Sequence, residues 1–437
     1  MQAGKLWKRF LTIDHLEILY NDKIKKKPSV GMDKISPKKF EKDLSQNLEI
    51  LIKKLQNGTY HFTHYKMLLF NKGPEKAPRM VCVPTLRDKL AATVINEILV
   101  GVYGEKSKTI LPQIAINQIV SNIDDYTHFI KLDISKFYSS IPHDKLMNVL
   151  NKKIRKTEIK GTILNALKTE AIAYPIRKHG LKGEREKGIP EGLPFSNALA
   201  NIYLSGIDEK YKNYPNILYV RYVDDILILL QGVDFGRIKK SISADLKKLG
   251  LKLNNKVDEG LIEKGFEYLG YKIDRKTVSV RESSVLKIEQ SIEDLLSETK
   301  GTTNYQYIEW KINIKITGFI LEKHKYGWMF FYSQISDEKL LFHLDDVVDK
   351  LLERYDLKGK IKVKRFVRTY HEIKKALHAT RYIPNIDEFD VNDKRKILQE
   401  IYKLELTEKS DQFIEVNFRK IMRREIRDIE KDIQNIS

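Results

Sequence analysis

The 437-residue chain contains a single cysteine, Cys82, which excludes a disulfide framework and a zinc site built from several cysteines. It has no run of about 18 apolar residues, the length that a membrane-spanning helix needs. Met1 to Tyr20 lacks the apolar core of a signal peptide. Internal repeats and low-complexity segments are also absent. We therefore expect a soluble, cytoplasmic protein with no membrane partner.

The chain also has far fewer acidic than basic residues. The chain carries 59 Asp and Glu against 79 Lys and Arg, which gives a net charge of +20 and a pI of about 9.5. A solvated, lysine-rich surface accounts for part of this excess, but not for an imbalance of this size. Because the charges are spread along the whole chain, they predict a long polyanion as partner. The length allows two or three domains, each with its own core.

Two adjacent acids, Asp224 and Asp225, lie between the apolar runs Ile217–Arg221 and Ile226–Leu230. The branched and aromatic flanks predict two strands of a hairpin with the acids at its tip. Neighbouring carboxylates repel one another, and a divalent cation with hard oxygen ligands would offset that repulsion. An exposed acidic turn is the alternative interpretation, since Asp is common in turns.

Two upstream segments strengthen the functional interpretation. Asp133 ends another apolar run and lies 91 residues before Asp224. Within residues 188–201, a loop rich in Gly and Pro opens into a helix of small residues. In this order the segments resemble the palm of a reverse transcriptase: the first catalytic Asp, a Pro-x-Gly-x-x-x-Ser loop, then Tyr-Val-Asp-Asp. Each motif alone is weak, whereas their order and spacing together are specific.

The resemblance implies an α+β fold of the right-hand polymerase type. Such a fold has fingers, a palm with an antiparallel sheet and helices, and a helical thumb, here followed by a helical C-terminal extension. The expected ranges are an N-terminal helical segment at 1–59, fingers at 60–120, palm at 121–275, thumb at 276–340 and the extension at 341–437.

Local patterns add details to this outline. Apolar spacing, caps and breakers predict helices, and alternation predicts strands. Residues 266–271 resemble the primer-grip hairpin, and the aromatic cluster at 326–332 is interpreted as core, with base stacking as the alternative. Helices are expected at 36–58, 88–102, 242–249, 283–299 and 305–321, and strands between 60 and 84.

The resemblance also implies the activity, RNA-directed DNA polymerisation by two-metal phosphoryl transfer. Asp133, Asp224 and Asp225 would be catalytic and would hold two Mg²⁺ ions, with the carbonyl group of Ile134 as a further ligand. One ion would activate the primer 3′-hydroxyl and the other would neutralise the pyrophosphate. The implied partners are an RNA template, deoxynucleoside triphosphates and the DNA product.

A second set of residues would bind the incoming nucleotide. Lys72 and Arg79 match the fingers cations that hold the triphosphate, although Lys72 lies among other lysines. Tyr138, five residues after Asp133, matches the aromatic ring that blocks a ribose 2′-hydroxyl. Core packing is the alternative there, and it suits Phe137 better. The full expected set is Lys72, Arg79, Tyr138, Glu191, Gly192, Ser196 and Lys256.

The loop departs from the family at two positions. Glu191 replaces the usual Gln, and an ionised Glu cannot donate a hydrogen bond to a nucleotide. Asn197 replaces a frequent Pro. These departures put ordinary nucleotide handling in question, but not the fold.

Basic and apolar residues alternate between Lys360 and Arg368, as in a nucleic-acid-binding face. Lys362, Lys364 and Arg365 are the candidate RNA contacts of this segment. A solvated helix face would have the same composition.

Three prokaryotic lineages fit the palm motifs. Group II intron enzymes usually add a zinc-dependent nuclease region, which one cysteine cannot supply. Retron enzymes usually carry an Asn-Ala-x-x-His signature, which residues 103–130 lack. By elimination, the chain resembles the antiphage-defence reverse transcriptases, which implies a dedicated structured noncoding RNA. An intron maturase and a non-polymerising RNA scaffold remain the alternatives, and homo-oligomerisation stays open.

Overall fold

The computed structural model describes residues 2–25, 29–70, 78–173, 185–255 and 257–433. The chain forms two compact units. Unit 1 contains residues 1–110 and 129–259, and unit 2 contains residues 111–128 and 260–437. None of the helices in the described ranges combines the length and the apolar character that crossing a bilayer requires.

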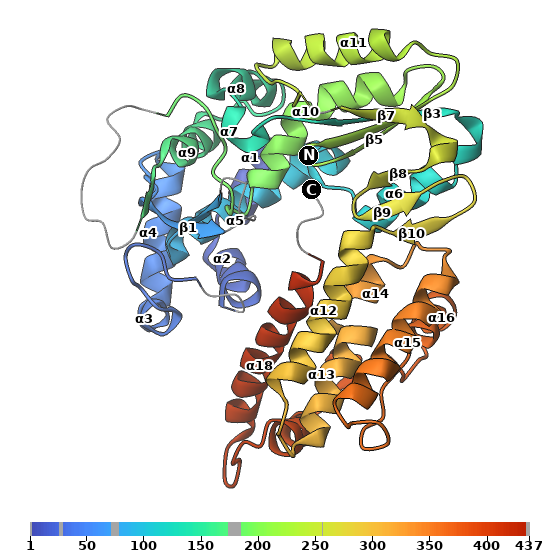
Figure 1. Cartoon of the computed structure of the whole chain (residues 1–437). Helices are drawn as coiled ribbons and strands as arrows, with labels where there is room; N and C mark the ends of the chain where they lie inside the picture. The colour runs from blue at the N-terminus through green and yellow to red at the C-terminus, as the bar shows by residue number, and fades with distance from the viewer. Residues whose placement is uncertain (1, 26–28, 71–77, 174–184, 256, 434–437) are drawn as a thin grey trace. The chain divides into compact units, whose positions relative to one another are not determined.

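Unit 1 combines a helical shell with two sheets (Figure 1). Its α-helices are α1 (Ala3–Phe10), α2 (Ile13–Leu19), α3 (Pro37–Lys42), α4 (Leu44–Gln56), α5 (Leu86–Tyr103), α7 (Phe137–Ser140), α8 (His143–Asn151), α9 (Thr157–Lys168), α10 (Ser196–Lys212) and α11 (Phe235–Lys248). Its strands are β1 (Tyr65–Phe70), β2 (Arg79–Val83), β3 (His128–Asp133), β4 (Ala171–Ala173), β5 (Ile217–Tyr222), β6 (Asp225–Leu230) and β7 (Asp258–Leu261), where β3 and β7 reach the boundary of the unit.

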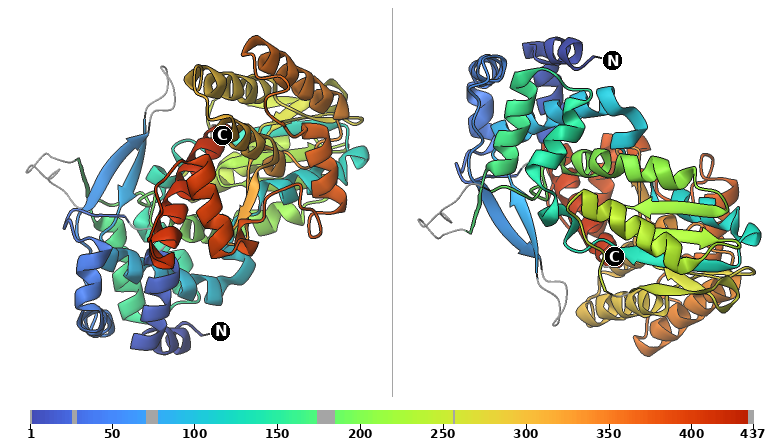
Figure 2. Two further views of the ribbon diagram at one scale, coloured as in Figure 1. Left: turned by 90° about the horizontal axis from the view of Figure 1, so that it is seen from below. Right: turned by 90° about the horizontal axis from the view of Figure 1, so that it is seen from above.

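The larger sheet has the strand order β5-β6-β3-β7, so the expected hairpin and the strand before Asp133 are neighbours. β5 and β6 pair antiparallel from Ile217↔Leu230 to Tyr222↔Asp225, which confirms the hairpin prediction. All six residues of β6 are buried, because apolar side chains cover both faces of this strand. Helices α10 and α11 lie across one face of the sheet in Figure 1 and in the right-hand view of Figure 2.

The smaller sheet of unit 1 has the order β2-β1-β4. β1 and β2 pair antiparallel, with Phe70 opposite Arg79, so the predicted strands between 60 and 84 are confirmed. Thr85 caps the following helix α5: its hydroxyl oxygen accepts a hydrogen bond from the backbone N–H of Asp88. The cap fixes the start of α5, and the buried apolar face of this helix belongs to the same core as Cys82 of β2.

Unit 2 is mostly helical. Its α-helices are α6 (Pro112–Val120), α12 (Glu282–Glu298), α13 (Tyr305–Thr317), α14 (Trp328–Phe331), α15 (Glu338–Arg354), α16 (Phe366–Lys375), α17 (Val391–Lys396) and α18 (Asp411–Lys431). Its strands are β8 (Phe266–Tyr268), β9 (Tyr271–Ile273), β10 (Val278–Val280), β11 (Phe319–Leu321) and β12 (His324–Tyr326).

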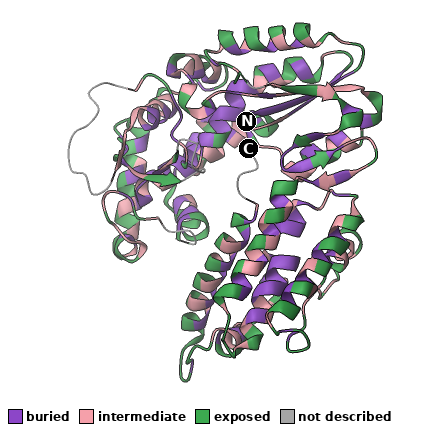
Figure 3. Ribbon diagram, viewed as in Figure 1, coloured by how far each residue is buried: buried purple, intermediate pink, exposed green. Residues whose placement is uncertain are grey.

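Helix α13 is the centre of unit 2. Every residue from Lys311 to Thr317 is buried, and this part of the helix is purple in Figure 3. Trp328, Met329, Phe330 and Tyr332 are also buried, so the aromatic cluster is core, as expected. β8 and β9 pair antiparallel around Leu269 and Gly270, which confirms the hairpin expected at 266–271.

The mixed α+β class is confirmed, with two corrections to individual helices. The expected helix 36–58 is two helices, α3 and α4, because Asp43 has φ −123° and interrupts the helical backbone. The expected helix 305–321 ends at Thr317, because Gly318 has a positive φ of 64° and a strand follows. The assignment of fingers, palm, thumb and extension to residue ranges stays a prediction.

Candidate active site

The turn between β5 and β6 carries two of the three expected catalytic acids. Tyr222 pairs with Asp225, so Val223 and Asp224 form a two-residue turn. Val223 has φ +56°, a left-handed conformation that is unfavourable for a β-branched residue. Such strain persists only where the surrounding structure holds it, and it is typical of functional sites.

Arg221 holds this strained turn. Its Nη1 donates to the carbonyl oxygen of Val223 at 2.7 Å, while Nε and Nη2 donate to the carboxylate of Asp208 on α10 at 2.7 and 2.5 Å. The Arg221 side chain is only 7% exposed, so the ion pair is shielded from water. A bidentate pair of this kind fixes the guanidinium group in one orientation. The turn is therefore anchored to the helix that covers the sheet.

Asp133, the third expected acid, ends β3 next to the turn. The backbone N–H of Ile134 donates to the carbonyl oxygen of Asp224 at 3.2 Å, which joins the end of β3 to the turn. The backbone N–H of Asn254 donates to the carbonyl oxygen of Asp133 at 2.8 Å, and its side-chain amide donates to the Asp133 carboxylate. Three segments far apart in the sequence thus meet at one edge of the sheet.

The negative charges of Asp133 and Asp224 act on the carboxyl group of Asp225. Its side chain is buried, and burial, followed by the charge of Asp224, raises its pKa to about 7. Lys131 opposes this rise, and the charge of Asp133 adds the smallest contribution to it. A cation bound here would offset the repulsion, and carboxylate oxygens are the ligands that Mg²⁺ prefers. The chemistry of the three acids therefore fits a divalent metal.

The side chains of the described residues do not form a preformed metal-coordination site. Among the described residues, no three His, Cys, Asp or Glu side chains are arranged so that they could hold a metal ion. The Asp133 carboxylate accepts its hydrogen bond from Asn254 instead. The metal roles of Asp133, Ile134, Asp224 and Asp225 stay predictions.

The loop before α10 lies against β2. The backbone N–H of Cys82 donates to the carbonyl oxygen of Glu191 at 2.7 Å. Gly192 has φ +103°, and a Cβ there would lie 2.6 Å from the carbonyl oxygen of Cys82, so only glycine fits. The buried hydroxyl of Ser196 donates to the carbonyl oxygen of Pro190 at 2.6 Å. Gly192 and Ser196 therefore shape the loop, and their contact with a nucleotide stays a prediction.

The structure brings Arg79 and Glu191 together. Nε of Arg79 donates to Oε2 of Glu191 at 2.6 Å, between two partly exposed side chains. The residue that departs from the family is thus the ion-pair partner of the cation expected to hold the triphosphate.

Tyr138 lies close to the same groups. Its hydroxyl donates to Oδ1 of Asn197 at 2.8 Å, so Tyr138 of α7 is in contact with Asn197 of α10. Burial raises the pKa of Tyr138, and the charges of Asp224 and Glu191 raise it further. The charges of the acidic turn and of the loop thus both act on Tyr138, and its role as the sugar gate stays a prediction.

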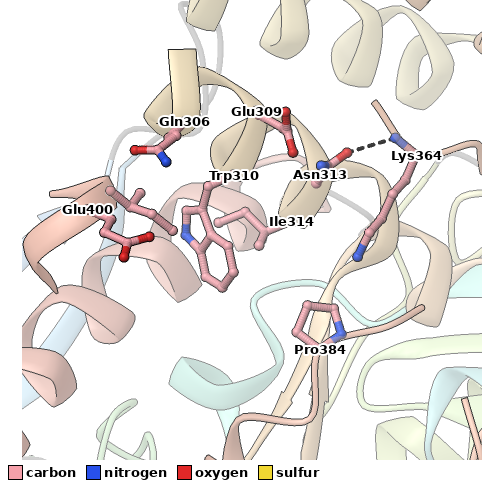
Figure 4. A pocket seen from close by; sticks show the side chains of 9 residues that line it. Gln306, Glu309, Trp310, Asn313, Ile314, Lys364, Pro384 and Glu400 are labelled. Atoms are coloured by element: carbon pink, nitrogen blue, oxygen red, sulfur yellow. Dashed lines mark hydrogen bonds between the residues drawn. The ribbon is translucent and has the colours of Figure 1, made fainter. Parts of the chain in front are cut away.

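The remaining predicted site residues are Lys72, Lys256 and the cations of the basic segment around Lys364. Lys72 and Lys256 lie outside the described residues. Residues 361–365 are not helical, so a solvated helix face does not account for Lys362, Lys364 and Arg365, whereas residues 366–368 begin α16. Lys364 lines a pocket of about 300 Å³ with Trp310 and other residues, and its backbone N–H donates to Asn313 at 2.7 Å (Figure 4).

The side chains of this segment have partners within unit 2. Nζ of Lys364 donates to the carbonyl oxygen of Tyr382 at 2.5 Å, and burial lowers the pKa of Lys364. Arg365 pairs with Asp349 at 2.8 Å. Lys362 is exposed. Binding of nucleic acid by Lys362, Lys364 and Arg365 stays a prediction, and two of the three cations would have to exchange an internal partner for RNA.

Comparison with known proteins shows what the segment that carries these acids is similar to. Residues 70–273, which contain all three acids, match the family model described as "Reverse transcriptase (RNA-dependent DNA polymerase)". Residues 70–273 are thus similar to reverse transcriptase domains. Domains of this family use divalent metal ions, typically Mg²⁺.

Two curated relatives and one solved structure are similar to the chain. The "Uncharacterized 91 kDa protein in cob intron" of Schizosaccharomyces pombe is 26% identical over 48% of this chain and 26% of the relative. The "Putative COX1/OXI3 intron 1 protein" of Saccharomyces cerevisiae is 24% identical over 60% of this chain and 38% of the relative. The apo telomerase of Candida tropicalis is 15% identical over 82% of this chain and 68% of that chain, with a TM-score of 0.42. The chain thus spans less than half the length of these two intron relatives.

Sequence reasoning missed Arg221, Asp208 and Asn254, which position the acids of the reverse transcriptase domain. An arginine inside an otherwise apolar strand was a usable signal for Arg221, because such a residue needs a buried partner. No local pattern identified Asp208 or Asn254, since their partners are 13 and 121 residues away in the sequence.

Proposed function

We propose that the chain is an RNA-directed DNA polymerase that extends a primer with deoxynucleotides. The observation that supports this most strongly is the meeting of Asp133, Asp224 and Asp225 at one sheet edge, inside the matched domain. Two Mg²⁺ ions held there would activate the primer hydroxyl and neutralise the pyrophosphate.

The chain's own residues would supply geometry and charge. Arg221 fixes the turn that carries Asp224, and Asn254 orients Asp133. The ring of Tyr138 would exclude a ribose 2′-hydroxyl, and Arg79 would bind phosphate oxygens after leaving Glu191. Little covalent chemistry is then left to the protein, as in other phosphoryl-transfer sites.

The test is extension of a DNA primer on an RNA template with Mg²⁺ and the four deoxynucleotides. Wild-type protein should extend the primer, and Asp224→Asn should not. The matched control is Asp258→Asn, which removes an exposed carboxylate from the edge strand of the same sheet. RNA binding without extension by the wild type would favour the scaffold alternative.

Two cellular settings compete for this activity. Antiphage defence in the cytoplasm, with a dedicated noncoding RNA, is supported by the variant loop at Glu191 and Asn197 and by the helices that follow the domain. An intron-type setting is supported by the intron names of the two curated relatives. Sequencing the RNA that co-purifies with the protein distinguishes them, and loss of phage protection in Asp224→Asn would support defence.

A further inference from the structure

On helix α18 and its C-cap residue Asp432, the buried acids and most of the cations lie on different faces, while Asp411 and Glu430 are exposed acids. The acids Glu425 and Asp432 point into unit 2, where both are buried. Five cations between positions 419 and 427 lie on the other side or at its border, and four of them are exposed; the five are Arg419, Lys420, Arg423, Arg424 and Arg427. Figure 3 shows exposed residues along this helix, which is red in Figure 1.

The inward acids are paired with α13. Nζ of Lys311 lies 2.6 Å from Glu425 and 3.3 Å from Asp428, and Nζ of Lys315 lies 3.0 Å from Asp432. These acids therefore neutralise the lysines of α13. They are not available to neutralise the arginines of α18.

The outward cations form a stripe. Lys420, Arg424 and Arg427 follow the spacing i, i+4, i+7, which places them on one face with neighbouring Cβ atoms about 5–6 Å apart. None of these three makes an ion pair with a carboxylate in the described part of the chain. Arg423 is half-buried; burial and the charge of Arg419 lower its pKa, against the charge of Glu322. We call Lys420, Arg424 and Arg427 the α18 stripe.

A row of like charges without counterions costs free energy unless a polyanion neutralises it. An anionic membrane would need an apolar face beside the cations. The apolar face of α18, with Ile414, Phe418 and Met422, is instead packed into the core of unit 2, and of the apolar side chains of this helix only Phe413 and Val416 are exposed. Exposed Phe413, on the first turn, adds a ring on which an unpaired base could stack. These features favour a nucleic acid.

We propose that the α18 stripe is a binding surface for the phosphate backbone of the RNA on which this polymerase acts. The proposal rests on the proposed function for the choice of RNA, and it adds a surface outside the matched reverse transcriptase domain.

The experiment measures binding of a labelled RNA stem-loop by fluorescence anisotropy between about 50 and 200 mM salt. Lys420→Gln, Arg424→Gln and Arg427→Gln are combined in one variant. Each lost phosphate contact removes about 0.7–0.9 from the slope of log K against log salt, so the slope should fall by about 2 and affinity by tenfold or more. A charge-retaining variant, Lys420→Arg with Arg424→Lys and Arg427→Lys, should keep the wild-type slope.

A second variant controls for net charge. Lys276→Gln, Lys339→Gln and Lys375→Gln together remove three exposed cations from other elements of unit 2. Loss of affinity in this control equal to that of the stripe variant would overturn the proposal, and so would an unchanged slope in the stripe variant. Loss of binding to phosphatidylserine vesicles with unchanged RNA binding would assign the stripe to membranes instead. Because anisotropy needs no synthesis, failure of primer extension in the wild type would overturn only the proposed function.

Discussion

Nε of Arg79 donates a hydrogen bond to the carboxylate of Glu191 at 2.6 Å. An incoming triphosphate would therefore have to displace a carboxylate from the cation that we expect to bind it. The ion pair also explains how the loop tolerates an acid where the family resemblance leads us to expect Gln, because the charge of Glu191 is neutralised within the fold.

Glu191→Gln should lower KM for deoxynucleotides by about two- to fivefold, since an exposed ion pair of this kind is worth up to about 1 kcal/mol. The turnover number should change little. Steady-state primer extension measures both constants, and Glu186→Gln, an exposed acid in the same loop, is the control. A higher KM in Glu191→Gln would mean that Glu191 assists nucleotide binding.

Tyr138→Ala should raise ribonucleotide incorporation relative to deoxynucleotide incorporation by about tenfold or more, because the ring no longer excludes the 2′-hydroxyl. Tyr138→Phe keeps the ring and loses only the hydrogen bond to Asn197, so it should discriminate like the wild type. Competition between the two nucleotides on one template gives the ratio. Equal discrimination in Tyr138→Ala would reassign the residue to packing.

Asp225→Asn should abolish extension and also stabilise unit 1. The folded pKa of Asp225 is about 7, above its ordinary value of 3.8, so the folded state binds the proton more tightly than the unfolded state. Stability contributed by protonated Asp225 is therefore lost as the pH rises from about 4 to 7. Because Asn cannot ionise, the variant does not lose this stability. Its free energy of unfolding should exceed that of the wild type by up to about 4 kcal/mol at high pH, at about 1.4 kcal/mol for each pKa unit.

Urea unfolding with EDTA at pH 4 and pH 8 measures this effect. The gain of Asp225→Asn over wild type should be near zero at pH 4 and largest at pH 8. Added Mg²⁺ should reduce the gain by stabilising the wild type alone. An Asp225→Asn protein less stable than wild type at pH 8 would show that the buried carboxylate is not under repulsion.

Lys311→Ala should destabilise unit 2 by about 3–5 kcal/mol, because it leaves the buried charge of Glu425 without its partner. Burial opposes the charged form of Lys311, but Glu425 and Asp428 outweigh this and raise its pKa. Lys311→Met with Glu425→Gln should recover most of the loss, since Gln still accepts the hydrogen bond from Tyr402.

Lys350→Ala is the exposed control, because its pair with Asp346 lies on the surface of α15, where water screens it, and should contribute little to stability. Thermal unfolding of the four proteins gives the comparison. A loss in Lys311→Ala no greater than in Lys350→Ala would show that the buried pair does not hold α18 on α13.

The sequence predicted those parts of the fold that local patterns determine. The β5–β6 hairpin and the helix after Ser196 follow from apolar runs broken by Asp or Gly and Pro, which are strong local signals. The end of α13 was missed although Gly318 marks it, because the apolar pattern continues into β11.

Local sequence patterns could not predict contacts between segments that are distant in the sequence. The pair of Arg79 with Glu191, the clamp of Arg221 on Asp208 and the contact of Asn254 with Asp133 all depend on tertiary packing. The basic segment at Lys364 was judged by composition, whereas the charge separation on α18 became visible only once Lys311 and Lys315 were seen to bind its acids.

The central claim is that Asp133, Asp224 and Asp225 form one polymerase centre. Single-turnover extension of a primed RNA template, with Mg²⁺ and saturating deoxynucleotides, tests it in three single variants that replace each acid with Asn. The account predicts a loss of at least about a hundredfold in each variant, equivalent to about 2.7 kcal/mol or more of barrier, with wild-type rates in Asp258→Asn. Wild-type rates in any one of the three Asn variants would contradict the assignment of that acid to the centre.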